Sequence, residues 1–156
     1  MRILVNRLGY NMNKWIWWIL VGVYMGVIFY LSHQPATNSN ELSTNITIVI
    51  TETVSQLTKT EGIQLSEWNH LVRKSTHFFA YMGLALIVWR AMSHHVTGHW
   101  TYLSAWGIAT IYAMTDEFHQ LYVPGRGGQL SDVILDSAGA ATGLLFLFLF
   151  RYLSRK

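Results

Sequence analysis

The sequence contains no cysteine, only two prolines and little charge, since Asp, Glu, Lys and Arg make up 12% of its 156 residues. The absence of cysteine excludes disulfide bonds, thiolate nucleophiles, cysteine-based zinc sites and iron–sulfur clusters. Soluble domains carry roughly a quarter charged residues, and this chain falls well below that norm. Hydrophobic residues account for 51% of the chain, and no low-complexity tract interrupts them. The composition is typical of a membrane protein and excludes a disordered or collagen-like chain.

Four apolar runs are long enough to cross a bilayer, which takes roughly 17 to 25 residues in a helix. The predicted spans are residues 15–31, 71–92, 100–122 and 132–150. A signal peptide is the alternative for the first run, because Arg2, Arg7 and Lys14 precede it. Signal peptides end in small residues, whereas this run ends in Phe29, Tyr30 and Leu31. We therefore predict an uncleaved span.

The long connection between the first two runs covers residues 33–69. Its apolar residues recur at helical spacing among Ser, Thr, Asn and Gln; they are Leu42, Ile46, Val49, Ile50 and Leu57. This pattern predicts an amphipathic helix on the outer membrane surface. The predicted fold is thus a single all-α membrane domain over residues 1–156, with four transmembrane helices plus an outer amphipathic interfacial helix.

The basic residues lie mainly near the ends of the runs. If the chain crosses the membrane an even number of times, most of them share one side of it. These residues are Arg2, Arg7, Lys14, Arg90, Arg151, Arg155 and Lys156. Lys and Arg close to span ends favour the cytoplasmic side, so both termini are predicted to be cytoplasmic. The basic residues responsible for the net charge of +3 then set the topology and contact membrane lipids. No nucleic-acid partner is expected.

Ionisable residues inside spans are costly and usually face the interior of a helix bundle. At about 1.5 Å per residue, His77 lies about 9 Å along the second run from the outer side, and Asp136 lies about 7 Å along the fourth. Asp116 lies about 24 Å along the third run from the cytoplasmic side. Three predicted helices therefore place polar side chains at one level near the outer surface.

Helical spacing gathers these polar residues into two stripes. The stripe on the second run is Arg73, His77 and Tyr81, and the stripe on the third run is Tyr112, Asp116, His119 and Gln120. On the fourth run, Gly139-x-x-x-Gly143 is a small-residue pattern that lets another helix approach closely. Asp132 is predicted to act in part as the N-cap of this last helix, whereas Asp136 lies one turn deeper.

Four sequence blocks follow one another in this part of the chain. They are Arg73-Lys74-x-x-His77-Phe78-x-x-Tyr81, Thr115-Asp116-Glu117-Phe118-His119-Gln120, Val123-Pro124-Gly125-Arg126 and Asp132-Val133-x-x-Asp136-x-x-Gly139. Together they resemble the signature of the VanZ-like family of bacterial membrane proteins, over roughly residues 32–150. Position 136 departs from the pattern, since a typical member has Asn there.

The resemblance implies a multi-spanning protein of the bacterial cytoplasmic membrane that acts in the cell envelope. The name-giving member of the family is associated with reduced susceptibility to the glycopeptide antibiotic teicoplanin. The resemblance implies no settled reaction, so whether the chain is an enzyme stays open.

We expect an outward-facing polar pocket that binds or processes an anionic envelope lipid or cell-wall precursor. The candidate catalytic residues are Glu117, His77 and Asp116, which would handle protons or orient the basic groups. The candidate substrate-binding residues are Arg73, Lys74, Tyr81, His119, Gln120, Arg126, Asp132 and Asp136. An enzyme of this kind would catalyse hydrolysis or transfer at a phosphoryl or acyl centre, with Glu117 or His77 as base and Arg126 stabilising charge.

Two other classes of function fit the same residues. One is a transporter or flippase for lipids or precursors, and the other is a non-enzymatic scaffold that docks an envelope synthase. No cofactor is expected. A metal ion at His77, Glu117 and His119 is the alternative; against it, the chain lacks His-Glu-x-x-His spacing and its arginines offer the carboxylates other partners.

Overall fold

The computed structural model describes residues 2–35, 44, 48 and 65–154. In this part of the chain the structure has four long α-helices and no strand: α1 (Arg2–Ser32), α3 (Leu65–Met92), α4 (His99–Gln120) and α5 (Leu130–Leu153). The all-α prediction is confirmed, and each predicted span falls mainly on a separate helix, although α1 begins at Arg2, well before residue 15, and α4 ends at Gln120, before residue 122. The apolar residues of the predicted amphipathic helix lie outside the described residues.

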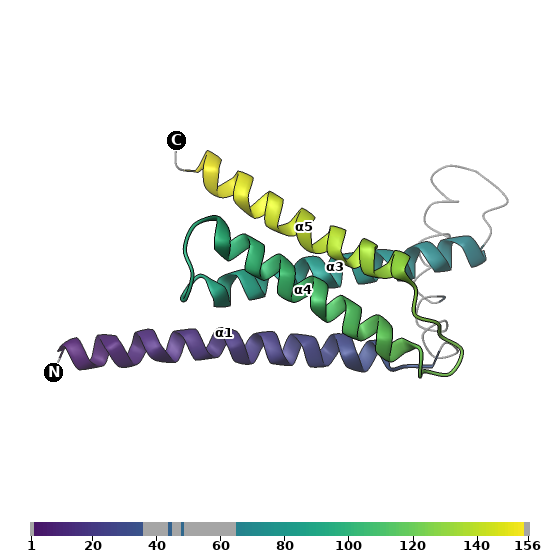
Figure 1. Ribbon diagram of the computed structural model, residues 1–156, viewed down its shortest axis with the longest axis horizontal. Coiled ribbons are helices and arrows are strands. Elements are labelled where there is room, and N and C mark those ends of the chain that lie inside the picture. Colours follow the sequence, from purple (N-terminus) through teal and green to yellow (C-terminus); the bar gives the residue numbers. More distant parts are fainter. Residues whose placement is uncertain (1, 36–43, 45–47, 49–64, 155–156) are drawn as a thin grey trace.

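The four helices run antiparallel to their neighbours in the chain (Figure 1). The start of α1, the end of α5 and the α3–α4 connection lie at one end of the bundle. The end of α1, the α4–α5 loop and the start of α5 lie at the opposite end. Helix α3 is central, because it packs against α5, α4 and α1.

Two glycines of α5 allow the close packing of α3 and α5. A Cβ atom on Gly139 would overlap the backbone carbonyl of Phe78, and one on Gly143 would lie 2.6 Å from Cγ of Met82. The predicted small-residue approach is therefore present, with α3 as the partner. It brings His77, next to Phe78, against Asp136, one turn before Gly139, and so sets the register of the polar site.

Replacing Gly139 with valine is expected to destabilise the protein by about 1–3 kcal/mol, because the added side chain forces α3 and α5 apart. Thermal unfolding of detergent-solubilised protein measures this loss. Gly107→Val is the matched control, since nothing lies within 4 Å of a Cβ at that position. Equal melting temperatures for the two variants would contradict the close α3–α5 contact.

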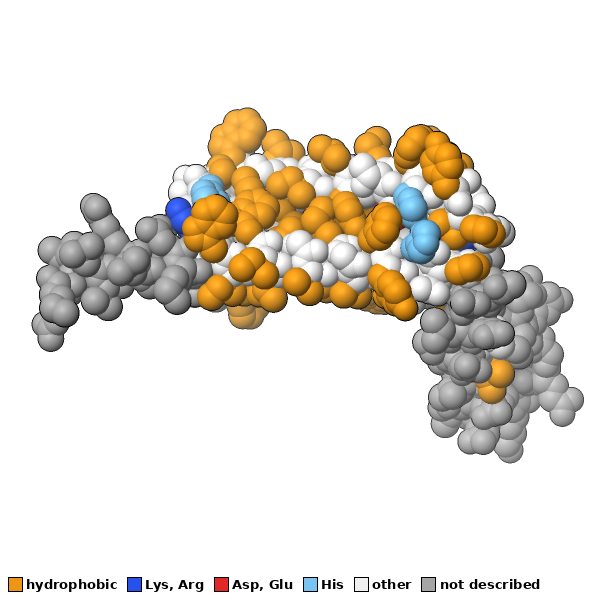
Figure 2. All heavy atoms as spheres, turned by 90° about the horizontal axis from the view of Figure 1, so that it is seen from below, with side chains coloured by type: hydrophobic (Ala, Val, Ile, Leu, Met, Phe, Trp, Pro, Cys, Tyr) orange, Lys and Arg blue, Asp and Glu red, His pale blue; other side chains and the backbone are white. Residues whose placement is uncertain are grey.

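Polarity is distributed in the opposite way to that of a soluble protein. Large apolar side chains are exposed, with Ile111 at 63% and Phe146 at 66%, whereas Asp116 and Asp136 are only 2% and 0% exposed. Figure 2 shows hydrophobic side chains gathered over the middle of the face that includes α1, with histidines toward either end. An apolar exterior around buried carboxylates suits hydrocarbon as the solvent.

Among the described residues, two helical segments are long and apolar enough to cross a membrane. They are Lys14–Ser32, with a mean hydropathy of 1.8, and Leu130–Leu153, with a mean hydropathy of 2.0. Helices α3 and α4 have the length but carry more polar and charged residues. Two helices can thus cross a membrane by length and composition, while the count of four spans stays a prediction.

Candidate functional site

A polar cavity of about 170 Å³ lies at the end of the bundle where the loop 121–129 joins α4 to α5. Its lining comes from α3, α4, α5 and this loop: Arg73, Lys74, His77, Gln120, Gly125, Arg126, Gly127, Gln129, Asp132 and Leu135. Six of the predicted site residues are in this lining. The structure therefore brings these six residues together at one end of the bundle.

The basic side chains form a rim around this cavity, and one of them is paired. Lys74 Nζ lies 3.0 Å from Asp132 Oδ1, with both side chains partly exposed. The prediction that Asp132 caps α5 is wrong, because the helix begins earlier: its N-cap is Gln129, which has extended backbone and makes no side-chain cap hydrogen bond. Asp132 lies in the first turn instead, where its charge is favourable to the helix dipole.

The other two rim residues, Arg73 and Arg126, make no ion pair with an acid in the described part of the chain. The Nε atom of Arg126 is buried and lacks a hydrogen-bond partner there. Burial, and then the nearby Arg73, lower the pKa of Arg126, although a guanidinium remains charged at any physiological pH. The rim therefore carries two guanidinium groups without an ion-pair partner among the described residues, while the nearby charges of Asp116 and Glu117 favour the charged form of Arg126.

Glu117 lies beneath the rim and is 4% exposed. Its Oε2 accepts a hydrogen bond from the backbone N–H of Gln129 at 2.9 Å, and its Oε1 lies 3.4 Å from the Nε2 donor of Gln120. A Cβ atom on Gly128 would overlap the carbonyl oxygen of Glu117, so only glycine permits this approach. Glu117 thus connects α4 to the loop that carries Arg126.

Asp116 is held from α1, a contact that the sequence did not indicate. The hydroxyl of Ser32 donates to Asp116 Oδ2 at 2.8 Å, and Gln120 Nε2 lies 3.4 Å from the same oxygen. Ser32 is 2% exposed. In the sequence it marks only the end of an apolar run, and no local signal pairs it with a residue 84 positions away.

His77, Glu117 and Asp136 form a compact group below the cavity. His77 Nδ1 lies 3.5 Å from Asp136 Oδ2, and one ligand atom from each of the three residues lies within 4.8 Å of the others. Neither carboxylate oxygen of Asp136 has a hydrogen-bond partner among the described residues. Asp136 thus stands where the sequence suggested His119 as a third metal ligand.

His119 and Tyr81 do not line the cavity. His119 Nε2 lies 3.0 Å from Nδ1 of His33, which directly follows α1, and its ring centre is 4.5 Å from that of Phe29 of α1. Tyr81 is fully buried, with its ring 6.2 Å from that of Tyr112. The predicted stripe on α4 therefore faces α1 in part, because helical spacing defines a face without specifying which neighbour it meets.

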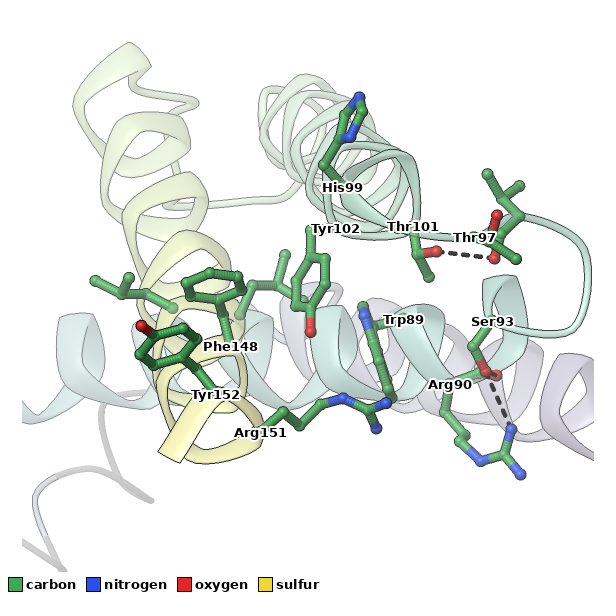
Figure 3. Close-up of a pocket in the computed structure, with 14 residues that line it drawn as sticks. Trp89, Arg90, Ser93, Thr97, His99, Thr101, Tyr102, Phe148, Arg151 and Tyr152 are labelled. Carbon is green, nitrogen blue, oxygen red and sulfur yellow. Dashed lines mark hydrogen bonds between the residues drawn. The ribbon is translucent and has the colours of Figure 1, made fainter. Parts of the chain in front are cut away.

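A larger cleft of about 910 Å³ lies at the opposite end of the bundle, near the α3–α4 connection. Figure 3 shows Trp89, Tyr102, Phe148 and Tyr152 around it. The Arg151 guanidinium lies 4.9 Å from the Trp89 ring centre. Aromatic and basic side chains are common where helices leave a membrane. None of the predicted site residues lines this cleft.

The fold and the site together define a small helical membrane protein in which buried carboxylates lie beneath a basic rim at one end of the bundle. The sequence model of the VanZ/LLP1 family matches residues 17–151, and the chain belongs to that family. Family membership indicates a membrane protein linked to the cell envelope. No curated protein and no solved structure matches the chain.

Proposed function

We propose that this protein spans the bacterial cytoplasmic membrane four times and binds, in its outward-facing cavity, the phosphate of an anionic envelope lipid or lipid-linked cell-wall precursor. The observation that carries the proposal is the positive charge of Arg73 and Arg126 at the cavity, with no acid paired to either in the described residues. Arginine holds phosphate through paired, charge-assisted hydrogen bonds.

The dimensions of the cavity support a headgroup fragment as the ligand. Pockets for whole drug-sized ligands enclose about 300–1,000 Å³, and this cavity has about 170 Å³. A phosphate group fits such a space, while a complete precursor with its sugars does not. The apolar chains of the lipid would stay in hydrocarbon against exposed side chains such as Leu130 and Ile134 of α5.

Binding is favoured over passage across the membrane. Between the cavity and the larger cleft at the opposite end, buried apolar side chains fill the middle of the bundle, among them Leu84, Val88 and Ala109. A flippase needs a polar path for the headgroup, and this packing offers none among the described residues. A scaffold role for an envelope synthase is compatible with the same cavity, and the binding assay below tests it.

The proposed topology predicts opposite labelling of two loops. In this cysteine-free chain, Gly127→Cys should react with an impermeant thiol reagent added to intact cells, because the α4–α5 loop faces outward. Thr97→Cys, in the exposed α3–α4 connection, should react only after the membrane is opened. A Cβ at Gly127 has open space around it. Labelling of Thr97→Cys in intact cells would overturn the orientation.

The binding proposal is tested with purified protein by native mass spectrometry. The lipids are phosphatidylglycerol and undecaprenyl phosphate, with phosphatidylcholine as the zwitterionic reference. We expect at least a tenfold preference for the anionic lipids, decreasing as salt screens the charges. The two anionic arms distinguish an envelope phospholipid from a precursor carrier. Equal affinity for all three lipids would leave only the scaffold role.

A further inference from the structure

We propose that His77, Glu117 and Asp136 bind one divalent metal ion of the zinc or manganese class at the base of the polar cavity. The three residues come from α3, α4 and α5, so the ion would join three helices. This inference deepens the proposed function, and it rests on that function only where an anionic oxygen of the ligand completes the coordination of the ion.

The distance between His77 and Asp136 fits two ligands of one ion better than a hydrogen bond. Charge-assisted N–H···O bonds measure about 2.7–2.9 Å, whereas His77 Nδ1 and Asp136 Oδ2 are 3.5 Å apart. Ligands bonded at about 2.0–2.1 Å in tetrahedral geometry are separated by about 3.3 Å. The three ligand atoms lie within 4.8 Å of one another. Small side-chain rotations would bring them to the separation that one ion requires.

Asp136 is buried with one long contact to His77, at 3.5 Å, as its ion pair among the described residues. Its side chain is 0% exposed, and neither oxygen has a hydrogen-bond partner among the described residues. A buried carboxylate without compensation is strongly unfavourable, and buried charges are normally paired or coordinate metals. Two carboxylates balance the charge of one divalent cation, with His77 as a neutral third ligand. A protonated His77 without a metal ion could balance only one of the two acids.

The surroundings of Glu117 resemble those of a metal ligand. Gln129 and Gln120 hold its carboxylate from behind, at 2.9 Å and 3.4 Å, as outer hydrogen bonds do for ligating carboxylates. His77 also lines the cavity, so an ion bound by it would lie within reach of a ligand in the cavity. Three protein ligands and an open position are the pattern of catalytic zinc sites, and that position would accept a phosphate oxygen or water.

The first test measures metal binding without any lipid. Tag-free protein in detergent is treated with chelator, and zinc is then titrated by calorimetry in a background where His94, His95 and His99 are replaced by Gln to remove adventitious ligands. We expect about one equivalent of zinc. His77→Gln and Asp136→Asn should weaken binding at least tenfold, in line with the loss of a metal-site residue, while His33→Gln, at a histidine outside the cavity, should bind as the background does.

Cobalt supplies a spectroscopic readout, since a four-coordinate ion gives visible absorption that Asp136→Asn should lose. If a variant does not fold, the background protein still decides the question, because bound zinc must raise its melting temperature by mass action. No zinc-dependent rise, or equal zinc affinity in His77→Gln, would overturn the metal site. If zinc does not bind but the chelated protein still prefers anionic lipids, the metal site is excluded and the proposed function is retained. If zinc binds but the protein shows no lipid preference, the proposed function is excluded and the metal site is retained.

Discussion

Replacing Arg126 with alanine is expected to lower the affinity for phosphatidylglycerol and undecaprenyl phosphate by about 10-fold to 150-fold. Hydrogen bonds to a charged group contribute about 1.5–3 kcal/mol, and each 1.4 kcal/mol corresponds to about a tenfold change in affinity. The effect should be specific to anionic lipids, because Arg126 lines the cavity with an Nε atom that no described residue satisfies.

Two further variants determine what the Arg126 result means. Arg151→Ala removes a guanidinium at the opposite end of the bundle, where it lies over Trp89, and it should leave the anionic preference intact. Arg126→Lys keeps the charge but cannot form the paired hydrogen bonds of a guanidinium, so we expect intermediate affinity. Wild-type affinity in Arg126→Lys would mean that positive charge alone suffices. If Arg126→Ala binds the anionic lipids with wild-type affinity, the cavity is not their binding site.

The depth of the site was predictable from the sequence because a helix rises by a constant amount per residue. Counting from the ends of the apolar runs placed His77 and Asp136 at one level, and in the structure they are 3.5 Å apart. The Gly139 pattern likewise predicted a close helix contact, which is present against Phe78. These predictions needed only the register of each helix along its own axis.

Rotation and partner choice were not predictable in the same way. His119 was expected in the site but lies against His33, the residue that follows α1, and Ser32 was not expected there but holds Asp116. Both contacts depend on how α1 packs against α4, which is a long-range outcome of side-chain packing. Asp132 pairs with Lys74 instead of capping α5, because a helix start shifted by a few residues changes which side chain can act as the cap.

The charge of Glu117 is the strongest test of whether the site does more than bind. Glu117→Gln should insert and melt like the wild-type protein, because glutamine keeps an oxygen that can accept the backbone N–H of Gln129, the 2.9 Å contact that connects α4 to the loop. If the protein acts on the bound headgroup, the variant should nevertheless lose headgroup turnover in liposomes. A missing general base lowers rates by about 10²–10⁴-fold.

Asp132→Asn is the matched control for Glu117→Gln, since it also converts one carboxylate to an amide at the same end of the bundle. Asp132 is partly exposed and paired with Lys74, so its charge is screened and the variant should lose at most a few-fold. Retained anionic-lipid binding with lost activity in Glu117→Gln would assign the carboxylate to chemistry, because the headgroup would still be held by the rim. Loss of both would assign it to positioning the loop that carries Arg126. Full activity in correctly inserted Glu117→Gln protein would exclude a role for this charge, and would leave His77 as the base to be tested by substitution.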